Sequence, residues 1–466
     1  MIDEQKMGSA SLGKLFLKFT FPATIGLVFA GTQGIISGFF VGNAVGSHGL
    51  AATTLAYPAL VAMFAIAHMI GVGTSSLVAL ALGRSDRQEA LKLIHNAFPL
   101  LLLAGIGFTA FGMAFSGSYL RLLGASGPVF DMANTYLRII FAGSIFVLLS
   151  LALDPLTRND GKPRLAMICL TGGVFINIGL DYLFVMRMGM GVTGAAISMV
   201  IAFAFSGILL SIYFFSRWSE LRLKPRSLFL KPEIILRIMK AGLPSFAMQF
   251  ATFFLLFANN YMLLKYGSEL AVTGYGIIGY VFSTFSFIYE GIALGTQPII
   301  GFNYGARYYS RVAKTLKMAI IACLGTGAVG FLILSIFPEQ IIRIFNHDSS
   351  ELLAITLNGM GIFMFTPLAQ GTVMLSSVYF QSINRSNTAL FIQLGKVFLF
   401  LSPLLLILPS LLGLDGVWLA TPTAEFLMLL VVLGLLWKEF GFLKNGKTVS
   451  EEGHCLASDI VSTPND

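Results

Sequence analysis

Long apolar segments, joined by short polar connections, follow one another along almost the whole sequence. Each is long enough to cross a bilayer as a helix, which takes about 20 predominantly apolar residues. Apolar and polar residues do not alternate within them, which argues against strands. We predict twelve membrane-spanning helices at about 15–41, 50–81, 93–115, 133–156, 164–186, 192–215, 236–264, 271–302, 313–337, 352–380, 388–409 and 416–437.

The second half of the sequence repeats the landmarks of the first, about 222 residues later. Each half holds six segments, an even number, so both halves enter the bilayer in the same orientation. Parallel repeats are a common plan of secondary transporters, with the substrate path between the halves. We predict an all-α polytopic membrane protein with two pseudo-symmetric six-helix lobes. The landmarks are Pro22 and Pro244, Gly73-Thr74 and Gly295-Thr296, Gly83 and Gly305, and Gly191-Val192 and Gly416-Val417.

The polar stretches set the predicted domain organisation. The lobes are expected at 1–215 and 241–443. Between them, 216–240 is basic and contains two prolines, and we interpret it as a cytoplasmic linker, with a short amphipathic helix against anionic headgroups as an open alternative. The polar residues 444–466 are predicted to form a disordered tail.

Basic residues fall mainly on one side of the predicted topology. Of the 30 Lys and Arg residues, 24 lie on the side that carries both termini, four lie on the other side, and Arg138 and Lys396 lie within spans. By the positive-inside rule, the rich side is cytoplasmic. We therefore expect a multi-pass protein of the cell (inner) membrane with both termini in the cytoplasm.

Composition narrows the function classes. The chain is 56% hydrophobic and 11% charged, with a mean hydropathy of +0.82, whereas soluble proteins carry about 25% charged residues. The net charge of +8 is spread over short loops, so lipids and small molecules, and not nucleic acid, are the expected partners. Three separated cysteines form no metal or disulfide motif. We expect a monomer without a cofactor. The sequence contains no Walker A motif, so an ATP-driven pump is not indicated.

Ionisable groups inside spans are costly and therefore mark candidate functional sites. Asn177 and Asp181 are four residues apart, so they share one helix face. This pair can coordinate Na⁺ through oxygen ligands or hold a proton that substrate displaces. Alternatively, Asp181 is solvated near the outer interface or pairs with Arg187.

A second set of polar residues is a candidate lining for a cavity between the lobes. His68 and Glu290 differ by 222, so they occupy equivalent mid-span positions. The alternative for each is a hydrogen bond that only packs helices together. Gln33 and Asn259 are uncharged candidates for the same cavity.

For two further charged residues, a purely structural role is an open alternative. Asp154 precedes Arg158 by four residues, so a local ion pair competes with a functional role. Lys396 lies one or two turns inside its span and is interpreted as a side chain that snorkels to the cytoplasmic interface.

Several motifs together resemble those of the MATE (multidrug and toxic compound extrusion) exporters, most closely the bacterial DinF-like and MepA-like branch. The resemblance covers about 10–440. The motifs are Arg158-Asn159-Asp160-Gly161-Lys162-Pro163, Asn177-Ile178-Gly179-Leu180-Asp181-Tyr182, Gly191-Val192-Thr193-Gly194-Ala195-Ala196, Gly295-Thr296-Gln297-Pro298, Asn303-Tyr304-Gly305-Ala306 and Gly416-Val417-Trp418.

The resemblance implies a V-shaped pair of lobes and a cation site in the first lobe that includes Asn177 and Asp181. This chain departs from the pattern in helix 1, where Ser37 fills the place of an Asp in many relatives. A helix 6 hydroxyl position falls on Met199, beside Ser198. One hypothesis is that Asp154 supplies the second carboxylate instead.

The favoured function is a secondary multidrug antiporter that exports cationic or amphipathic compounds in exchange for Na⁺ or H⁺, and not an enzyme. One alternative is a flippase for lipid-linked precursors, which would need a cationic cavity, whereas only Arg138 and Lys396 lie within spans. An intramembrane enzyme or a non-transporting membrane protein is less favoured. The five histidines form no metal motif of the HExxH kind.

Overall fold

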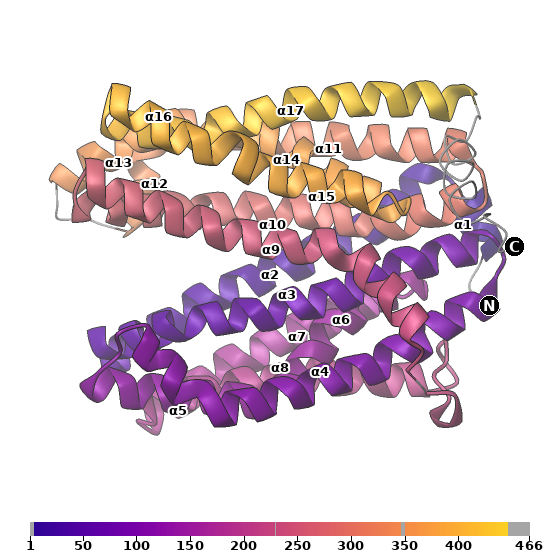
Figure 1. The fold of residues 1–466 in the computed structure, drawn as a ribbon, viewed down its shortest axis with the longest axis horizontal. Coiled ribbons are helices and arrows are strands. Elements are labelled where there is room, and N and C mark those ends of the chain that lie inside the picture. Colours follow the sequence, from indigo (N-terminus) through magenta and orange to yellow (C-terminus); the bar gives the residue numbers. More distant parts are fainter. Residues whose placement is uncertain (1–3, 229, 346–349, 446–466) are drawn as a thin grey trace, which may run out of the picture.

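Every regular element of the described chain is a helix (Figure 1). The computed structural model describes residues 4–228, 230–345 and 350–445. In these ranges, ten single helices are long and apolar enough to cross a membrane, and two bent pairs bring the number to twelve. The predicted all-α polytopic fold is therefore confirmed. Residues 446–466 of the predicted tail lie outside the described ranges.

The first half of the chain forms six spans, of which the fourth is bent by 57° between α5 and α6. Its elements are α1 (Glu4–Ser9), α2 (Leu12–Val45), α3 (Ser47–Gly83), α4 (Arg87–Leu122), α5 (Gly127–Ala142), α6 (Ser144–Asn159), α7 (Pro163–Asp181), the π-helical η1 (Tyr182–Arg187) and α8 (Gly191–Phe215).

The second half repeats this arrangement, and its fourth span is also bent, by 51° between α13 and α14. The fifth span of each half contains a π-helical segment, η1 or η3. The elements are the short 3₁₀ turn η2 (Pro225–Ser227), α9 (Pro232–Tyr266), α10 (Glu269–Gly305), α11 (Tyr309–Ile336), α12 (Pro338–Phe345), α13 (Ser350–Phe363), α14 (Thr366–Ser382), α15 (Ser386–Leu394), η3 (Gly395–Leu401), α16 (Ser402–Leu412) and α17 (Leu414–Asn445).

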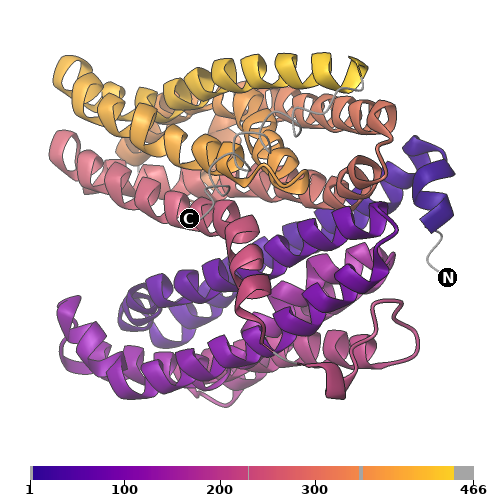
Figure 2. The ribbon, with the colours of Figure 1, turned by 45° about the vertical axis from the view of Figure 1, so that its right-hand side comes forward.

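The two halves form separate bundles, coloured indigo to magenta and pink to yellow in Figures 1 and 2. They meet through four central helices: α2 packs against α10, α9 packs against α3, and α3 also contacts α10. Because α2 is equivalent to α9 and α3 to α10, each half offers the same pair of helices to the other. This is the arrangement of an isologous two-fold interface.

Glycines set how closely the halves approach. A Cβ built on Gly83 would collide with the carbonyl oxygen of Phe302, and one built on Gly305 would collide with that of Leu80. Leu80 and Phe302 are themselves 222 residues apart, so the contact is reciprocal. Backbones can approach this closely only where no side chain intervenes.

A second layer of close contacts lies further along the same helices. A Cβ on Gly242 of α9 would meet the carbonyl oxygen of Met69, and one on Gly295 of α10 would meet the backbone of Thr20. Thr20 is the equivalent of Gly242. Between the two layers, Ser75 Oγ donates a hydrogen bond of 3.3 Å to Gln297 Oε1. These residues are also equivalent, so the pseudo-two-fold axis passes between them.

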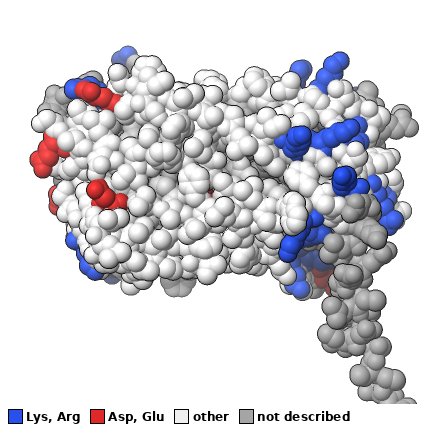
Figure 3. All heavy atoms as spheres, turned by 90° about the horizontal axis from the view of Figure 1, so that it is seen from above, with Lys and Arg blue, Asp and Glu red and all other residues white. Residues whose placement is uncertain are grey.

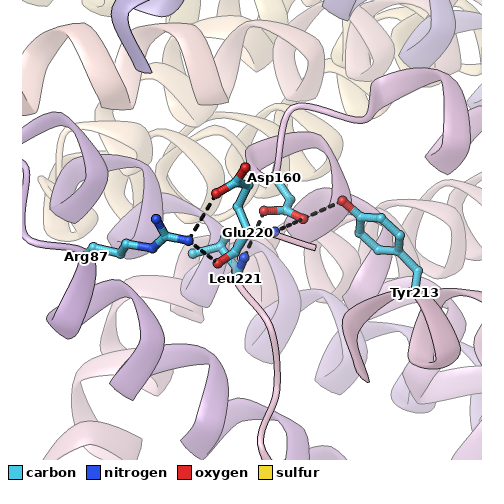
Figure 4. A network of polar contacts seen from close by, with 5 residues as sticks. All are labelled: Arg87, Asp160, Tyr213, Glu220 and Leu221. Carbon is cyan, nitrogen blue, oxygen red and sulfur yellow. Dashed lines mark hydrogen bonds and ion pairs between the residues drawn. The ribbon is translucent and has the colours of Figure 1, made fainter. Parts of the chain in front are cut away.

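The connection between the halves is bound to the first half through Asp160 (Figure 4). The fully buried carboxylate accepts hydrogen bonds from the Tyr213 hydroxyl and from the N–H groups of Glu220 and Leu221. Arg87 in turn donates to the Glu220 carbonyl and forms an ion pair of 3.0 Å with its carboxylate. Burial raises the pKa of Asp160, and these hydrogen bonds lower it in part.

Two side chains of α4 bind the rest of this connection. His95 Nε2 accepts from the Lys224 N–H at 3.0 Å, and Asn96 Oδ1 accepts from the Lys231 N–H at 2.6 Å. The predicted linker at 216–240 is shorter in the structure, because α9 already begins at Pro232. Within 216–231, η2 is the one helical element among the described residues.

The residues next to Asp160 in this motif also have structural roles. Arg158 forms a buried ion pair with Asp154, at 2.5 Å. Asn159 donates to the carbonyl oxygen of Ser75 at 2.6 Å. Gly161 turns the chain at a φ of +75°, in the left-handed region that favours glycine, and the next helix begins two residues later.

The first helix crosses to the other half. Arg311 of α11 donates hydrogen bonds to the carbonyl oxygens of Met7, at 3.1 Å, and Ala10, at 2.8 Å. Asn303 of α10 also donates to Met7, at 3.4 Å. The start of the chain is therefore bound to the second half, although α2 belongs to the first.

Exchanging Gly242 for Ala should weaken the contact between the halves, because the new methyl group would collide with the Met69 carbonyl. Overpacking of this kind costs about 1–3 kcal/mol. We expect a lower thermal midpoint of the purified protein in detergent. Gly276→Ala is the matched control on α10, because its Cβ would meet no atom within 4 Å. Equal midpoints for the two variants would contradict the close-contact model.

Exchanging Asp160 for Asn should loosen the linker. One amide oxygen cannot serve the three donors that the carboxylate accepts, and each buried donor left unpaired costs about 1–3 kcal/mol. We expect a lower thermal midpoint and faster proteolysis within 216–231. Asp131→Asn, on the exposed surface of α5, should change neither. An Asp160 variant that resists protease as the parent does would refute this role.

Candidate functional site

The buried carboxylate of Asp181 is the centre of a polar cluster in the first half. It is the last residue of α7, and the span continues as the π-helical η1. Asn177 lies one turn earlier, and both side chains are fully buried. The side chains therefore point into the bundle, as their spacing of four residues predicts.

Hydroxyl groups from two other helices bind this carboxylate. Ser37 of α2 donates to Oδ2, and Ser198 of α8 donates to Oδ1. Asn177 Nδ2 lies 3.2 Å from Ser198 Oγ, whereas its Oδ1 is buried without a hydrogen bond. The site thus gathers one carboxylate, two hydroxyls and one free amide oxygen from α2, α7 and α8.

This set of oxygen atoms suits a small monovalent ligand. Hard cations prefer carboxylate, carbonyl and hydroxyl oxygens. One carboxylate balances one positive charge, which fits Na⁺ or a proton. In the ranges that the structure describes, no three His, Cys, Asp or Glu side chains form a group that could hold a metal ion.

For both Asp181 and Asp154, an ion pair with a nearby arginine was an alternative to a functional role. Arg187 does not pair with Asp181, because its Nε donates to the Tyr182 hydroxyl at 2.9 Å. Asp154 pairs with Arg158, as the local reading predicts. In the described ranges, no hydrogen bond or ion pair joins Asp154 to the Asp181 cluster, in which Ser37 of α2 supplies a hydroxyl group.

The four other cavity candidates lie in three different places. His68 and Glu290 both line a small cavity where the halves meet. Asn259 is fully buried, and its amide donates to the Leu255 carbonyl, so it faces the interior of the second half. Gln33 is half-buried on α2, one turn from Ser37.

Sequence reasoning missed an ion pair inside the second half. Lys396 Nζ lies 2.8 Å from Glu425 Oε1 of α17, and the two side chains are 18% and 4% exposed. The prediction that Lys396 snorkels is therefore wrong, because the ammonium group has a buried partner. An acid within the last apolar span was the available signal. Nearby, Arg385 forms an ion pair with buried Glu439, at 2.6 Å.

Comparison with known families identifies both halves separately. The family model described as MatE matches residues 22–183 and 244–407. Its two matches begin at the equivalent prolines. Among curated proteins, the chain is 27% identical over 452 residues to the multidrug export protein MepA of Staphylococcus haemolyticus, covering 93% of this chain and 97% of that protein. MepA of Staphylococcus aureus strain N315 is 24% identical, covering 91% and 93%.

Solved structures share the fold over nearly the whole length. A multidrug resistance MATE family transporter of the MOP superfamily, in an outward-facing conformation, matches with a TM-score of 0.90 at 22% identity, covering 96% of this chain and 99% of that one. The MATE multidrug transporter DinF-BH, solved as a complex with a small-molecule ligand, matches with a TM-score of 0.84 at 30% identity, covering 92% and 96%.

Exchanging Lys396 for Met should destabilise the second half, because it leaves Glu425 buried without its partner. Breaking a buried pair costs about 3–5 kcal/mol, whereas replacing both members by apolar residues is often neutral. We expect a lower thermal midpoint for Lys396→Met and recovery in Lys396→Met/Glu425→Leu. A single variant that melts at the parent's temperature would show that the pair adds no stability.

Proposed function

The chain belongs to the MatE family of membrane transporters, and on that basis we propose that it is a secondary multidrug antiporter. It exports cationic or amphipathic small molecules while Na⁺ or H⁺ flows inward. Membership of a transporter family sets aside the intramembrane enzyme. Because one chain carries both lobes, a monomer embedded in lipid contains the complete machinery.

The Asp181 cluster is the observation that carries this proposal. Its carboxylate is fully buried, six residues before the end of the span Pro163–Arg187, and in the described ranges its hydrogen-bond partners include no cationic side chain. Such a group calls for a cation from outside the protein. The free Oδ1 of Asn177 offers a further ligand. The names of the MepA relatives, and the ligand complex of the multidrug transporter DinF-BH, support drugs as the exported class.

Helix α2 provides a route from this cluster to the lobe interface. It carries Ser37, which binds Asp181, and Thr20 and Thr24, which lie against Gly295 and Gly291 of the other half. Loss or gain of a cation at Asp181 changes what Ser37 can bind and so changes the position of α2. A ligand shifts such an equilibrium only by binding one state more tightly than the other.

The distribution of charge supports an orientation with both termini in the cytoplasm. On the face drawn in Figure 3, most Lys and Arg side chains gather at one end, and acidic side chains gather at the other. The start of α1 and the end of α17 lie at the basic end in Figure 1. The positive-inside rule then gives the direction of export, away from that end.

Exchanging Asp181 for Asn should abolish uphill efflux, because the variant keeps the shape of the side chain but lacks its charge. The test is dye efflux from proteoliposomes under an imposed Na⁺ gradient and, separately, an imposed pH gradient. The parent should export under one gradient, which identifies the coupling ion.

The control Asp131→Asn removes an exposed acid and should export at the parent's rate. Detergent melting of Asp181→Asn verifies that the variant is folded. Export at a normal rate by folded Asp181→Asn would refute the proposal. Efflux that neither gradient drives would refute cation coupling.

A further inference from the structure

A small cavity lies where the halves meet. His68 of α3 and Glu290 of α10, which are equivalent positions, both line it. Helices α9, α14 and α15 complete the lining with uncharged side chains, which include Ser245, Gln381 and Gln393. Its volume of ≈ 10 Å³ is about the space that one water molecule needs.

The His68 ring presents a basic nitrogen to its surroundings. Its Nδ1 lies 2.9 Å from the carbonyl oxygen of Phe64, one turn earlier. A carbonyl oxygen only accepts, so Nδ1 carries the proton and Nε2 is the nitrogen left to bind another. Gln249 Nε2 of α9 lies 3.3 Å from the same Nδ1; both groups are donors in this tautomer, so this is a contact between the halves and not a hydrogen bond.

Glu290 has no hydrogen bond or ion pair to any residue in the described ranges. The charged groups near enough to act on it are His68, Arg158 and Asp154. Arg158 and Asp154 form a pair at 2.5 Å, so their charges largely cancel. His68 is therefore the group through which the surroundings of Glu290 can gain a net charge.

The Glu290 carboxyl group is half-buried in this structure, and closer approach of the halves would remove its remaining water without supplying donors in exchange. A charged carboxylate in such a place is costly, and the neutral form is much less so. When the halves part, water reaches the group and the penalty falls. Proton binding and lobe closure are therefore thermodynamically linked at this position, as any ligand is linked to the state that binds it better.

We propose that Glu290 and His68 form a second proton-binding site, which is filled when the halves close on each other and emptied when they part. The site rests on the proposed alternation of the lobes. It is distinct from the Asp181 cluster, which lies within the first half and binds the coupling ion. In the closed form, Glu290 and His68 share one proton, directly or through a bridging water, so that the two side chains together carry no net charge.

The test measures the separation of the halves at equilibrium. Gln88 of α4 and Ser310 of α11 are exposed, equivalent positions at the basic end of each half. Cysteines at these two sites, with Cys169, Cys323 and Cys455 changed to Ala, carry spin labels. Electron–electron distance measurements in lipid nanodiscs between pH 5 and pH 9 then give the ratio of closed to open molecules. Asp181→Asn is present throughout, so that the other acid cannot titrate.

With Glu290 intact, the closed fraction should rise as the pH falls. If the two forms differ tenfold in proton affinity, the closed-to-open ratio changes by about tenfold across the titration. Glu290→Gln mimics the neutral acid and should remain closed at every pH. Glu290→Asp keeps an acid and should keep a titration with a displaced midpoint. His68→Gln should also displace it.

Glu269→Gln, at the exposed start of the same helix, should titrate as the parent does. A Glu290→Gln protein with the parent's pH dependence would overturn the proposal, and so would a parent ratio that does not change with pH. Neither result bears on the proposed function, which the efflux of Asp181→Asn decides. Conversely, efflux by Asp181→Asn would refute that function while leaving this titration interpretable.

Discussion

The direct contact of backbones between α3 and α10 is the constraint on which the rest of the molecule depends. Gly83 and Gly305 let these helices touch without interlocking side chains. Lipid supplies no hydrophobic drive to hold helices together, so such contacts rest on van der Waals packing and a few polar bonds. Around these glycines, Ile299 and Phe302 of α10 belong to the same buried apolar cluster as Val78 and Leu82 of α3, so side chains also cross the interface.

The two halves share a scaffold and differ in charge. In the first half, Asp181 binds only hydroxyl groups and is open to an external cation. In the second half, Glu425 takes its cation from the chain itself, as Lys396. Both arrangements join the fifth and sixth spans of their half. The duplication therefore supplies the same helix pair twice: one copy is neutralised internally, and the other is the copy to which we assign coupling in the proposed function.

The sequence predicted the scaffold better than the site, because the spans follow from patterns along the chain, whereas the site depends on contacts between residues that are distant in the sequence. Segment length and the 222-residue repeat are visible along the chain, and they gave the spans correctly. Asp160, Ser198 and Glu425 act through partners on other helices. No spacing rule indicates those partners. The error for Lys396 has this origin, since Glu425 follows 29 residues later. Asp154 was the opposite case, because its partner is local.

The ends of α2 and α9 are tied across the molecule in an equivalent way. Ala10, just before α2, is bound to Arg311 of the second half. Lys231, just before α9, is bound to Asn96 of the first half. Each helix therefore begins on the opposite lobe from the one to which it belongs.

In the alternation of the lobes that we propose, these two helices would have to bend or release their ends. Both contain a proline at the equivalent place, Pro22 and Pro244. Proline removes one backbone hydrogen bond from the helix and makes it the natural point of bending. The cross-tied ends thus hold the lobes in register, the prolines allow the motion, and the glycine contact sets its closed limit. Ser37 lies beyond Pro22 on α2, so bending at that proline changes the geometry at Asp181 directly.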